Sequence, residues 1–475
     1  MKKTILFLAI IVLPIGLVAQ IPFSDPITSI NGFDEALGSS IAVTIGNDGV
    51  VERVSFTGVE VSGFPNTIPI GEDFINDGNA NFTSGNLPIN PNVGDNVYAD
   101  FDNDGDLDYL DFGSTTGQPE DVQVTLIKKT GSEWETMTSH GLPELNRGLL
   151  IVDDLDNDGL LDVFVSGYTG SSGYTAWFHN NGNFTFNLVQ TFPGLSVASG
   201  DIGDVDWDGD KDIIYSGDFN MAVRMYLLRN NGTTFTVEDI SSGQGFIPIL
   251  GGSIAFGDKN GDGNIDYFVS SGSLGNAEGF VAQFKKADGD GLFDTPLTPP
   301  FEPIYNPSLK FTDTNNDGKI ELFAAGWESY GPAVANLFQN NTADNFDLEA
   351  SFDGFSNGDV VIEDFNGDGF KDVLYAGEVA PYVPILRLYL NETLGVDDYS
   401  KESFIVAPNP VKDVLNLKVP QSVQIGILQI IDITGKILLE KETVNTINLS
   451  ELSQGIYFVK VATNKGTQTK RIVKE

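Results

Sequence analysis

Six short stretches of this sequence repeat one arrangement of acidic and amide side chains. In each nine-residue stretch, positions 1, 3 and 5 are Asp or Asn, position 6 is Gly and position 9 is Asp or Glu. Alternate side chains can converge on one point, because glycine adopts backbone angles that other residues resist. The resulting oxygen ligands suit hard cations, and calcium tolerates their irregular geometry better than magnesium does. Without a cation, two carboxylates about 4 Å apart repel each other by roughly 1 to 4 kcal/mol.

The six stretches therefore predict up to six Ca²⁺ ions as cofactors. The candidate ligands, with position 7 included for its backbone carbonyl, are Asp100, Asp102, Asp104, Asp106 and Asp108; Asp154, Asp156, Asp158, Leu160 and Asp162; Asp204, Asp206, Asp208, Asp210 and Asp212; Asp258, Asn260, Asp262, Asn264 and Asp266; Asp313, Asn315, Asp317, Lys319 and Glu321; and Asp364, Asn366, Asp368, Phe370 and Asp372. The alternative is a set of solvated turns, since Asp, Asn and Gly are common in turns, but the repetition favours metal binding. An EF-hand is excluded because its loop needs a bidentate Glu at position 12, which none of the stretches has.

The stretches differ in their number of carboxylates. Those that start at Asp100, Asp154 and Asp204 have four carboxylates at positions 1, 3, 5 and 9, whereas the other three have an asparagine at position 3. Ligand charge tunes calcium affinity. We therefore expect the first three to bind calcium more tightly.

The spacing and flanks of the stretches predict the fold. The stretches begin 50 to 55 residues apart, between apolar runs such as "GLLIVD" and "DVFVSG" that read as β-strands. An upstream, degenerate copy keeps Asp48 and Glu52 but has Thr44 and Gly46 at the first two ligand positions, so we expect no ion there. Units of about 53 residues with three or four strands have the size of a propeller blade. We predict an all-β fold, a seven-bladed β-propeller with calcium-binding hairpin loops over residues 24–395, with six or eight blades as the alternatives.

These loops and the apolar strands that follow them resemble FG-GAP/VCBS repeats, the blades of integrin-alpha-type β-propellers. The resemblance covers roughly residues 24–395. It implies a propeller that holds calcium in a hairpin loop of each blade, through side chains at positions 1, 3, 5 and 9.

Charge and composition exclude several classes of function. The chain has 475 residues, with 67 acidic against 26 basic side chains and a net charge of −41, which argues against nucleic acid or an anionic membrane as a partner. It has no cysteine, which excludes disulfides, thiol catalysis and cysteine-ligated zinc. Its two histidines argue against a multi-histidine metal site.

The N-terminus reads as a secretory signal peptide, residues 1–19. Lys2 and Lys3 precede an apolar run, and "LVA" before residue 20 is a plausible cleavage site. A membrane anchor or buried helix is the alternative, but the run is interrupted by Pro14 and is too short to cross a bilayer. We expect an exported protein with no membrane span after cleavage.

The last segment has a different character. After a polar linker, residues 396–403, residues 404–475 are net basic and read as short alternating strands. An eighth blade is disfavoured, because the loop motif is absent. The pieces "APNPVKDVLNL", "IIDITGKIL" and "LSQGIYFVKV" resemble the C-terminal sorting domain of type IX secretion substrates of Bacteroidota. The resemblance implies a small β-sandwich that the type IX secretion machinery recognises, and a secreted or surface-attached protein.

No catalytic motif stands out from the sequence. Our first hypothesis is a binding or adhesion module for a glycan or protein ligand, and the alternative is a calcium-dependent extracellular polysaccharide-degrading enzyme, lyase-like in type; the fold does not decide between them. A deep cleft with converging Lys/Arg and Tyr/His side chains would favour the enzyme. Four tryptophans are possible sugar platforms, although packing between blades is the favoured interpretation; they are Trp134, Trp177, Trp207 and Trp327.

Overall fold

A computed structural model describes two stretches of the chain, residues 23–392 and 405–474. Short gaps interrupt them at residues 34–36, 62–66, 91–92, 117, 119–120, 243–244, 276–279, 288–292, 294, 329–330, 343, 382, 419–424, 433–435, 443–445, 451 and 464–465. The predicted signal peptide and linker lie outside the described residues. The prediction of an all-β protein is confirmed, since the described residues contain strands and no helix, and hence no helix that could cross a membrane. The chain divides into two compact units, residues 1–393 and 394–475.

The described strands of the first unit form seven sheets, which we number in chain order. Sheets 1 to 3 contain β1 (Leu37–Ile45), β2 (Val51–Val61), β3 (Thr67–Asn76) and β4 (Phe82–Ser84); β5 (Val93–Ala99), β6 (Asp108–Ser114), β7 (Gln123–Thr130) and β8 (Glu133–Met137); and β9 (Asn146–Asp153), β10 (Asp162–Tyr168), β11 (Gly173–Asn180) and β12 (Phe186–Phe192). Sheets 4 and 5 contain β13 (Ser196–Gly203), β14 (Asp212–Phe219), β15 (Ala222–Asn230) and β16 (Phe235–Asp239); and β17 (Leu250–Gly257), β18 (Tyr267–Ser273), β19 (Phe280–Lys286) and β20 (Thr295–Leu297). Sheets 6 and 7 contain β21 (Ile304–Thr312), β22 (Glu321–Glu328), β23 (Ala333–Thr342) and β24 (Asn345–Ser351); and β25 (Ser356–Glu363), β26 (Asp372–Ala380) and β27 (Val383–Tyr389).

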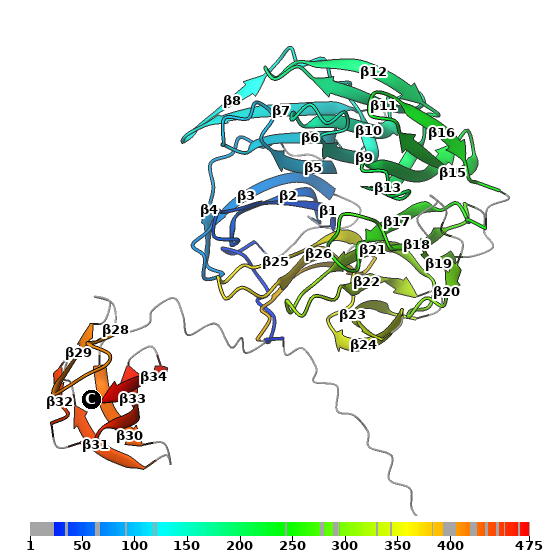
Figure 1. Cartoon of the computed structure of the whole chain (residues 1–475). Coiled ribbons are helices and arrows are strands. Elements are labelled where there is room, and N and C mark those ends of the chain that lie inside the picture. Colours follow the sequence, from blue (N-terminus) through cyan, green and yellow to red (C-terminus); the bar gives the residue numbers. More distant parts are fainter. Residues whose placement is uncertain are drawn as a thin grey trace, which may run out of the picture. The chain divides into compact units, whose positions relative to one another are not determined.

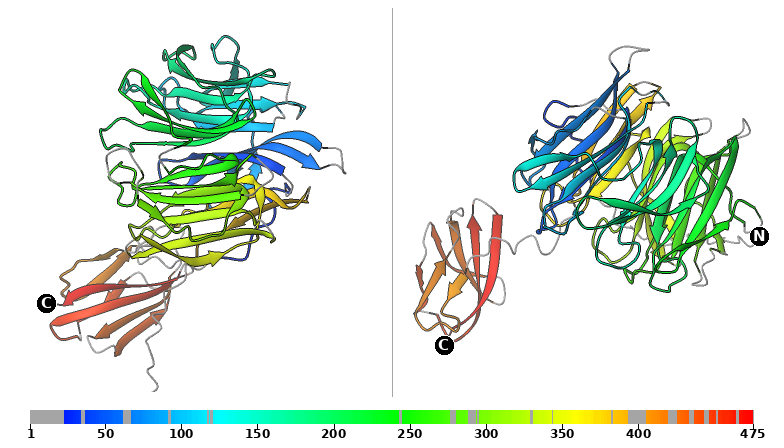
Figure 2. Two further views of the ribbon diagram at one scale, coloured as in Figure 1. Left: turned by 90° about the vertical axis from the view of Figure 1, so that its right-hand side faces the viewer. Right: turned by 90° about the horizontal axis from the view of Figure 1, so that it is seen from above.

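The seven sheets follow one another around a ring (Figure 1). Within each sheet the strands are antiparallel and lie in chain order. The first strand of each sheet contacts the first strand of the next, and β25 of sheet 7 contacts β1 of sheet 1. Adjacent sheets lie face to face when seen from the side (Figure 2). The arrangement is that of a β-propeller, in which each sheet buries its faces against two neighbours.

The hydrophobic core is divided among the gaps between neighbouring sheets. Between sheets 2 and 3, Leu110 and Leu126 pack with Val163 and Ala176. These side chains are essentially inaccessible to solvent, and each large one contributes roughly 1.5 to 3 kcal/mol of burial free energy. Strands such as β6 and β10 are buried along nearly their whole length, and because successive side chains point to opposite faces, they direct apolar side chains to both neighbouring sheets.

The N-terminal segment closes the ring in a way that the repeat pattern does not predict. Phe23 and Ile27 form antiparallel bridges with Asn391 and Leu388, on the open side of β27. Ile27 and Leu388 exchange two backbone hydrogen bonds of 2.8 and 3.0 Å. The start of the described chain therefore occupies the place that the fourth strand takes in the other sheets.

The second unit consists of two sheets around a common core. One contains β28 (Ile405–Ala407), β29 (Val414–Lys418) and β32 (Thr446–Asn448), and the other contains β30 (Ile425–Asp432), β31 (Ile437–Glu442), β33 (Gly455–Thr463) and β34 (Gly466–Lys474). Leu415 and Ile447 from the first sheet pack with Leu428, Val459 and Ile472 from the second. Such packing of two sheets on one core is a β-sandwich.

Candidate metal centres on the sheet hairpins

All six acidic stretches form the hairpin between the first and second strands of a sheet, in sheets 2 to 7. We call them loops 100, 154, 204, 258, 313 and 364 after their first residues. Their backbones share one conformation, because positions 4 and 6 have positive φ in every loop. Position 4 is Asn103, Asn157, Trp207, Gly261, Asn316 or Gly367, and position 6 is Gly105, Gly159, Gly209, Gly263, Gly318 or Gly369. Glycine at position 6 avoids the strain that a side chain has in this region.

Backbone amides hold the acidic side chains in the same place in each loop. In loop 100, the Gly105 N–H donates to Asp100 Oδ2 at 2.9 Å and the Asp106 N–H donates to Asp104 Oδ1 at 2.9 Å. The equivalent bonds, from position 6 to position 1 and from position 7 to position 5, recur in the other five loops at 2.8 to 3.0 Å. A carboxylate oxygen that accepts one such bond has a second lone pair with which it can bind a cation.

Position 9 is the most buried of the proposed ligands. Asp108 is fully inaccessible to solvent and accepts hydrogen bonds from the Phe101 N–H at 3.0 Å and the Lys129 N–H at 2.8 Å. Burial raises the pKa of Asp108, and likewise of Asp212 and Asp372, to about 7. A charged carboxylate is therefore costly at this position, and a bound cation would offset that cost.

Several ligand atoms lie close together without a hydrogen bond. In loop 100 and loop 204, the acids at positions 1, 3 and 9 offer oxygens within 4.8 Å of one another. Among the described residues, Asp102 Oδ1, Asp206 Oδ1 and Glu321 Oε1 are buried and accept no hydrogen bond. A buried carboxylate oxygen without a partner is unfavourable. These loops thus have the donor set that a hard divalent cation fits.

The asparagine at position 3 behaves differently from aspartate. The Nδ2 groups of Asn260 and Asn366 donate to the position 5 carboxylates of their loops at 3.1 Å. In loop 313, Asn315 Oδ1 accepts a 2.9 Å hydrogen bond from the Asp317 N–H. The position 7 side chains have no common arrangement, and their backbone carbonyls stay predicted ligands.

A residue on the third strand, opposite position 9, distinguishes two kinds of loop. The cross-strand register places Lys128, His179 and Arg229 there in the three loops with aspartate at position 3. Lys128 pairs with Asp102 and lies 3.4 Å from Asp104, and Arg229 Nη1 lies 3.1 Å from Asp206. The three loops with asparagine at position 3 have Ala287, Gln339 or Leu390 there. The additional carboxylate at position 3 is therefore matched by a basic side chain on the third strand. A local sequence pattern does not reveal this match, because the two residues are more than twenty positions apart in the chain.

Neighbouring loops are joined along the ring. Asn103 Nδ2 donates to Gly159 O at 2.8 Å, Asn157 Nδ2 to Asp210 Oδ1 at 2.7 Å, and Trp207 Nε1 to Ile265 O at 3.1 Å. Each donor is at position 4 of its loop, and each acceptor is in the loop of the next sheet. A cation that orders one loop would thereby also restrain its neighbour.

The degenerate copy in sheet 1 forms a tighter hairpin. Gly46 N–H donates to Val50 O at 2.8 Å, and Asp48 Oδ1 accepts a 3.2 Å hydrogen bond from the Val50 N–H. Thr44 pairs with Arg53 as part of the strand ladder. Of the residues that correspond to the first two ligand positions, Thr44 thus belongs to a strand and Gly46 to a short turn, rather than to a nine-residue loop.

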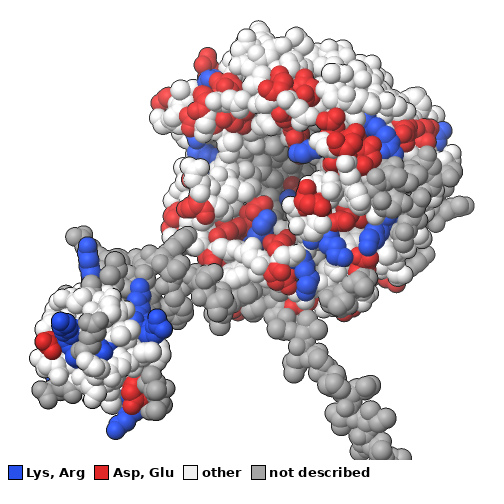
Figure 3. Space-filling view, in the orientation of Figure 1, with Lys and Arg blue, Asp and Glu red and all other residues white. Residues whose placement is uncertain are grey.

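A cavity of about 790 Å³ with both polar and apolar walls lies where the first strands meet. Its lining includes Asp95, Asp201 and Asp359, together with Lys310 and backbone of several glycines and serines. The Asp359 carboxylate accepts a 3.0 Å hydrogen bond from the Ile41 N–H and so links sheet 7 to sheet 1. Burial raises the pKa of Asp95 and Asp201 to about 6. In the space-filling view, acidic side chains interspersed with Lys and Arg lie around a hollow in the ring (Figure 3).

The four tryptophans have different environments. Trp177 is buried, and its Nε1 donates to Asp162 Oδ2 at 2.9 Å. The Arg53 guanidinium lies over the Trp134 ring, with its carbon 5.2 Å from the ring centroid, and Trp327 stacks on Tyr305. Trp207 is the most exposed of them, at 42%. Structural packing therefore accounts for Trp177, whereas Trp207 is at the rim of a candidate metal centre.

Comparison with known families agrees with this geometry. Residues 154–215 and 204–269 match the family described as FG-GAP-like repeat, and residues 405–475 match the secretion system C-terminal sorting domain. The chain thus contains FG-GAP-like repeats within residues 154–269 and a C-terminal sorting domain at residues 405–475. Both predicted resemblances are thus confirmed. The sorting domain directs this protein through type IX secretion to the cell surface or the extracellular space, and implies interaction with that secretion machinery.

Individual relatives are distant. The chain is 23% identical over 312 residues to cartilage acidic protein 1 of Mus musculus, and the match covers 57% of this chain and 46% of the mouse protein. It therefore spans about half the length of that curated relative. The extracellular domain of a hybrid two-component system from B. thetaiotaomicron is 8% identical, with a TM-score of 0.45 over 96% of this chain and 60% of the other. The Aleuria aurantia lectin is 10% identical, with a TM-score of 0.36 over 67% of this chain and 96% of the lectin.

Proposed function

We propose that this protein is a secreted or surface-attached binding module for a glycan or protein ligand. In this proposal, the seven sheets are the blades of a calcium-stabilised propeller over residues 24–395, and residues 404–475 serve export after a linker at 396–403. A signal peptide at residues 1–19 completes the export route. The observation that carries the proposal is the cavity at the first strands of the ring, which has carboxylates among polar and apolar walls that are fixed by hydrogen bonds between neighbouring sheets.

Calcium has a structural role in this proposal. The hairpin loops share one backbone conformation and one set of amide-to-carboxylate hydrogen bonds. Asp108 and Glu321 have pKa values raised to about 7 by burial, so an ionised group there needs a compensating charge. Carboxylate, amide and carbonyl oxygens are the ligands that calcium prefers. Calcium would supply charge compensation, while the chain's own amides orient the ligands.

The cavity chemistry favours neutral or amino-sugar ligands over acidic ones. Three carboxylates, Asp95, Asp201 and Asp359, face one ammonium group, Lys310, in its lining. Carboxylates accept hydrogen bonds from sugar hydroxyls, and their negative charge repels a polyanion. The described lining contains neither Tyr nor His, and its basic side chain is Lys310. This lining favours the binding module over the lyase-like alternative, which would use a converging Lys/Arg and Tyr/His set.

A glycan panel tests the binding function. We expect the purified protein, in millimolar calcium, to retain neutral or amino-sugar polysaccharides without releasing products. Val197→Trp places a bulky ring at the partly exposed cavity wall and should weaken binding at least tenfold, whereas Val383→Trp on the outer strand β27 should leave it within twofold. Release of oligosaccharides, or equal loss of binding in both variants, would contradict the proposal.

A thermal melt tests the calcium role separately. If calcium exceeds its Kd a hundredfold, each site adds about 2.7 kcal/mol to the free energy of unfolding. We therefore expect chelation to lower the Tm by about 10 °C or more, and calcium but not magnesium to restore it. An unchanged Tm after chelation would refute calcium stabilisation, and would leave the binding function to be judged on the glycan panel.

A further inference from the structure

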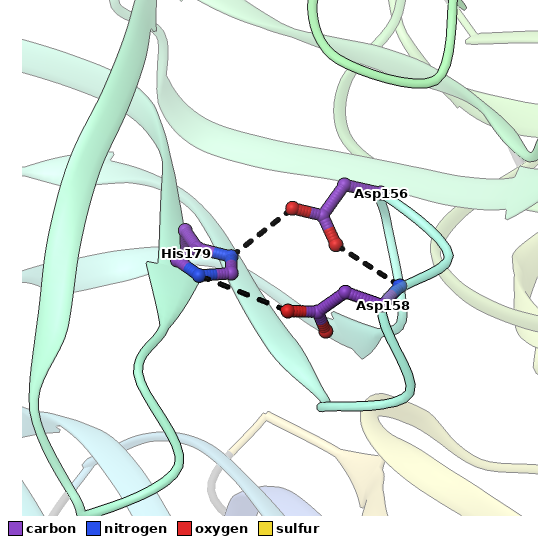
Figure 4. Close-up of side chains that lie close together, drawn as sticks. All are labelled: Asp156, Asp158 and His179. Atoms are coloured by element: carbon purple, nitrogen blue, oxygen red, sulfur yellow. Dashed lines mark hydrogen bonds and ion pairs between the residues drawn. The ribbon is translucent and has the colours of Figure 1, made fainter.

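Loop 154 differs from the other candidate metal centres because an imidazole enters its ligand set. His179 on β11 points between Asp156 and Asp158 of the hairpin (Figure 4). Its Nδ1 lies 3.1 Å from Asp156 Oδ2 and 3.4 Å from Asp162 Oδ1, and its Nε2 lies 3.9 Å from Asp158 Oδ2. The two ring nitrogens thus face carboxylate oxygens of three aspartates.

The chemistry of His179 sets it apart from its structural equivalents. Lys128 and Arg229, at the same register in sheets 2 and 4, are donors without a lone pair for a metal. A neutral imidazole has such a lone pair, and it suits zinc, copper, cobalt and nickel, whereas calcium prefers oxygen. In loop 154 the residue opposite position 9 can therefore act as a metal ligand.

The state of the ring nitrogen is a second, independent observation. His179 Nδ1 is buried, and its 3.1 Å contact with Asp156 Oδ2 lacks the geometry of a hydrogen bond. Ligands bound about 2.1 Å from one ion, at angles of about 90 to 109°, are about 3.0 to 3.4 Å apart. The separations of Nδ1 from the Asp156 and Asp162 oxygens are of this size. The nitrogen thus stands at the distance from both carboxylates that a shared ion requires.

We propose that loop 154 and His179 form a mixed nitrogen and oxygen site that binds a first-row transition-metal ion such as Zn²⁺ in preference to Ca²⁺. Asp156, Asp158 and Asp162 supply oxygens, and His179 supplies a nitrogen. Asp162 is oriented by the Asn180 N–H at 2.8 Å and by Trp177 Nε1 at 2.9 Å, which fixes the ligand next to the imidazole. The inference rests on the proposed cation-binding role of the hairpins, and it assigns a different ion to one of them.

Spectroscopy with cobalt and competition with zinc test this assignment on the full protein. In millimolar calcium, we expect one equivalent of Co²⁺ to give a visible d–d absorption band that one equivalent of Zn²⁺ removes. His179→Gln introduces the side chain that Gln339 places at this register in sheet 6, and should abolish the band and weaken zinc binding at least tenfold. His140→Gln is the matched control, since His140 accepts a hydrogen bond from the Leu142 N–H away from the loops.

The outcomes separate this inference from its alternatives. An unchanged cobalt band in His179→Gln, or displacement of zinc by millimolar calcium, would overturn the assignment and leave a histidine–aspartate ion pair. If His179→Gln fails to fold, Asp156→Asn serves instead, and it should weaken zinc binding at least tenfold while the Tm in calcium is retained. A protein whose Tm does not respond to calcium but which binds zinc through His179 would refute the calcium role alone.

Discussion

Arg229 should weaken cation binding in loop 204. Its guanidinium lies 3.1 Å from Asp206 Oδ2 and 2.8 Å from Glu238, and its side chain is 17% exposed. A cation held by Asp206 would be near this positive charge. Two like unit charges about 4 Å apart repel each other by about 1 kcal/mol in water and by about 4 kcal/mol at an effective dielectric of 20. Because Glu238 offsets part of the arginine charge, we expect Arg229→Gln to strengthen binding by about 1 to 2 kcal/mol, or about five- to thirtyfold.

Terbium luminescence gives an assay specific to this loop. Trp207, at position 4, is an indole within the loop that can transfer excitation energy to a bound lanthanide, and Trp207→Phe identifies that part of the signal. We expect calcium to displace terbium from this site at lower concentration in Arg229→Gln than in the wild type. Without calcium, the same variant should melt at a lower temperature, because Asp206 loses its partner.

A double substitution completes the test. Asp206→Asn alone should weaken calcium binding, and Asp206→Asn with Arg229→Gln should return the affinity to within about threefold of the wild type, since the pair then resembles Asn315 and Gln339 of sheet 6. Equal or weaker binding in Arg229→Gln would refute the reasoning. The prediction that loops with four carboxylates bind more tightly stays open, and this balance of charges argues that the difference is small.

Three further substitutions probe the ring. Ile30→Ala should cost about 2 to 5 kcal/mol because Ile30 is fully buried between sheets 1 and 7, whereas the exposed Ile45→Ala should cost less than 1 kcal/mol in the same urea unfolding assay. Asn180→Ala removes the 2.8 Å bond to Phe101 O between sheets 3 and 2, and should lower the free energy of unfolding by about 1 to 3 kcal/mol; no change would show that the bond is dispensable. The pKa of Asp201 is raised by burial to about 6 from 3.8, so its ionisation should remove up to about 3 kcal/mol of stability as pH rises from 4 to 6. Asp201→Asn lacks this ionisation, so its free energy of unfolding should rise relative to that of the wild type as the pH increases from 4 to 6. A difference between the two proteins that does not change with pH would contradict this.

Much of the candidate site is readable in the sequence because its geometry is local. Position 6 glycines such as Gly105 adopt positive φ, and Asp100 accepts the amide that follows five residues later. Such contacts within nine residues depend on residue type and spacing alone. The all-β class follows similarly from short apolar runs that are separated by turn residues. The loops, the sheets and the sorting domain were therefore predictable before any coordinates.

Contacts between strands and between sheets were not readable in this way. His179 meets Asp156 only because the hairpin of β10 and β11 sets their register, and the two residues are 23 positions apart in the sequence. Phe23 meets Asn391 because the ring closes on itself. A local pattern carries no information on such partners.

The sequence by itself determined the repeating unit, the acidic and amide side chains of each hairpin and the export signal at the C-terminus. The tertiary structure decided which side chain stands beside each hairpin, and thus whether a site meets an ammonium, a guanidinium, an imidazole or an apolar group. It also decided how the ring closes and where its cavity lies. The physical reason is that ligand convergence within a loop is fixed by backbone angles over a few residues, whereas charge compensation and closure depend on strand register and on packing between distant segments.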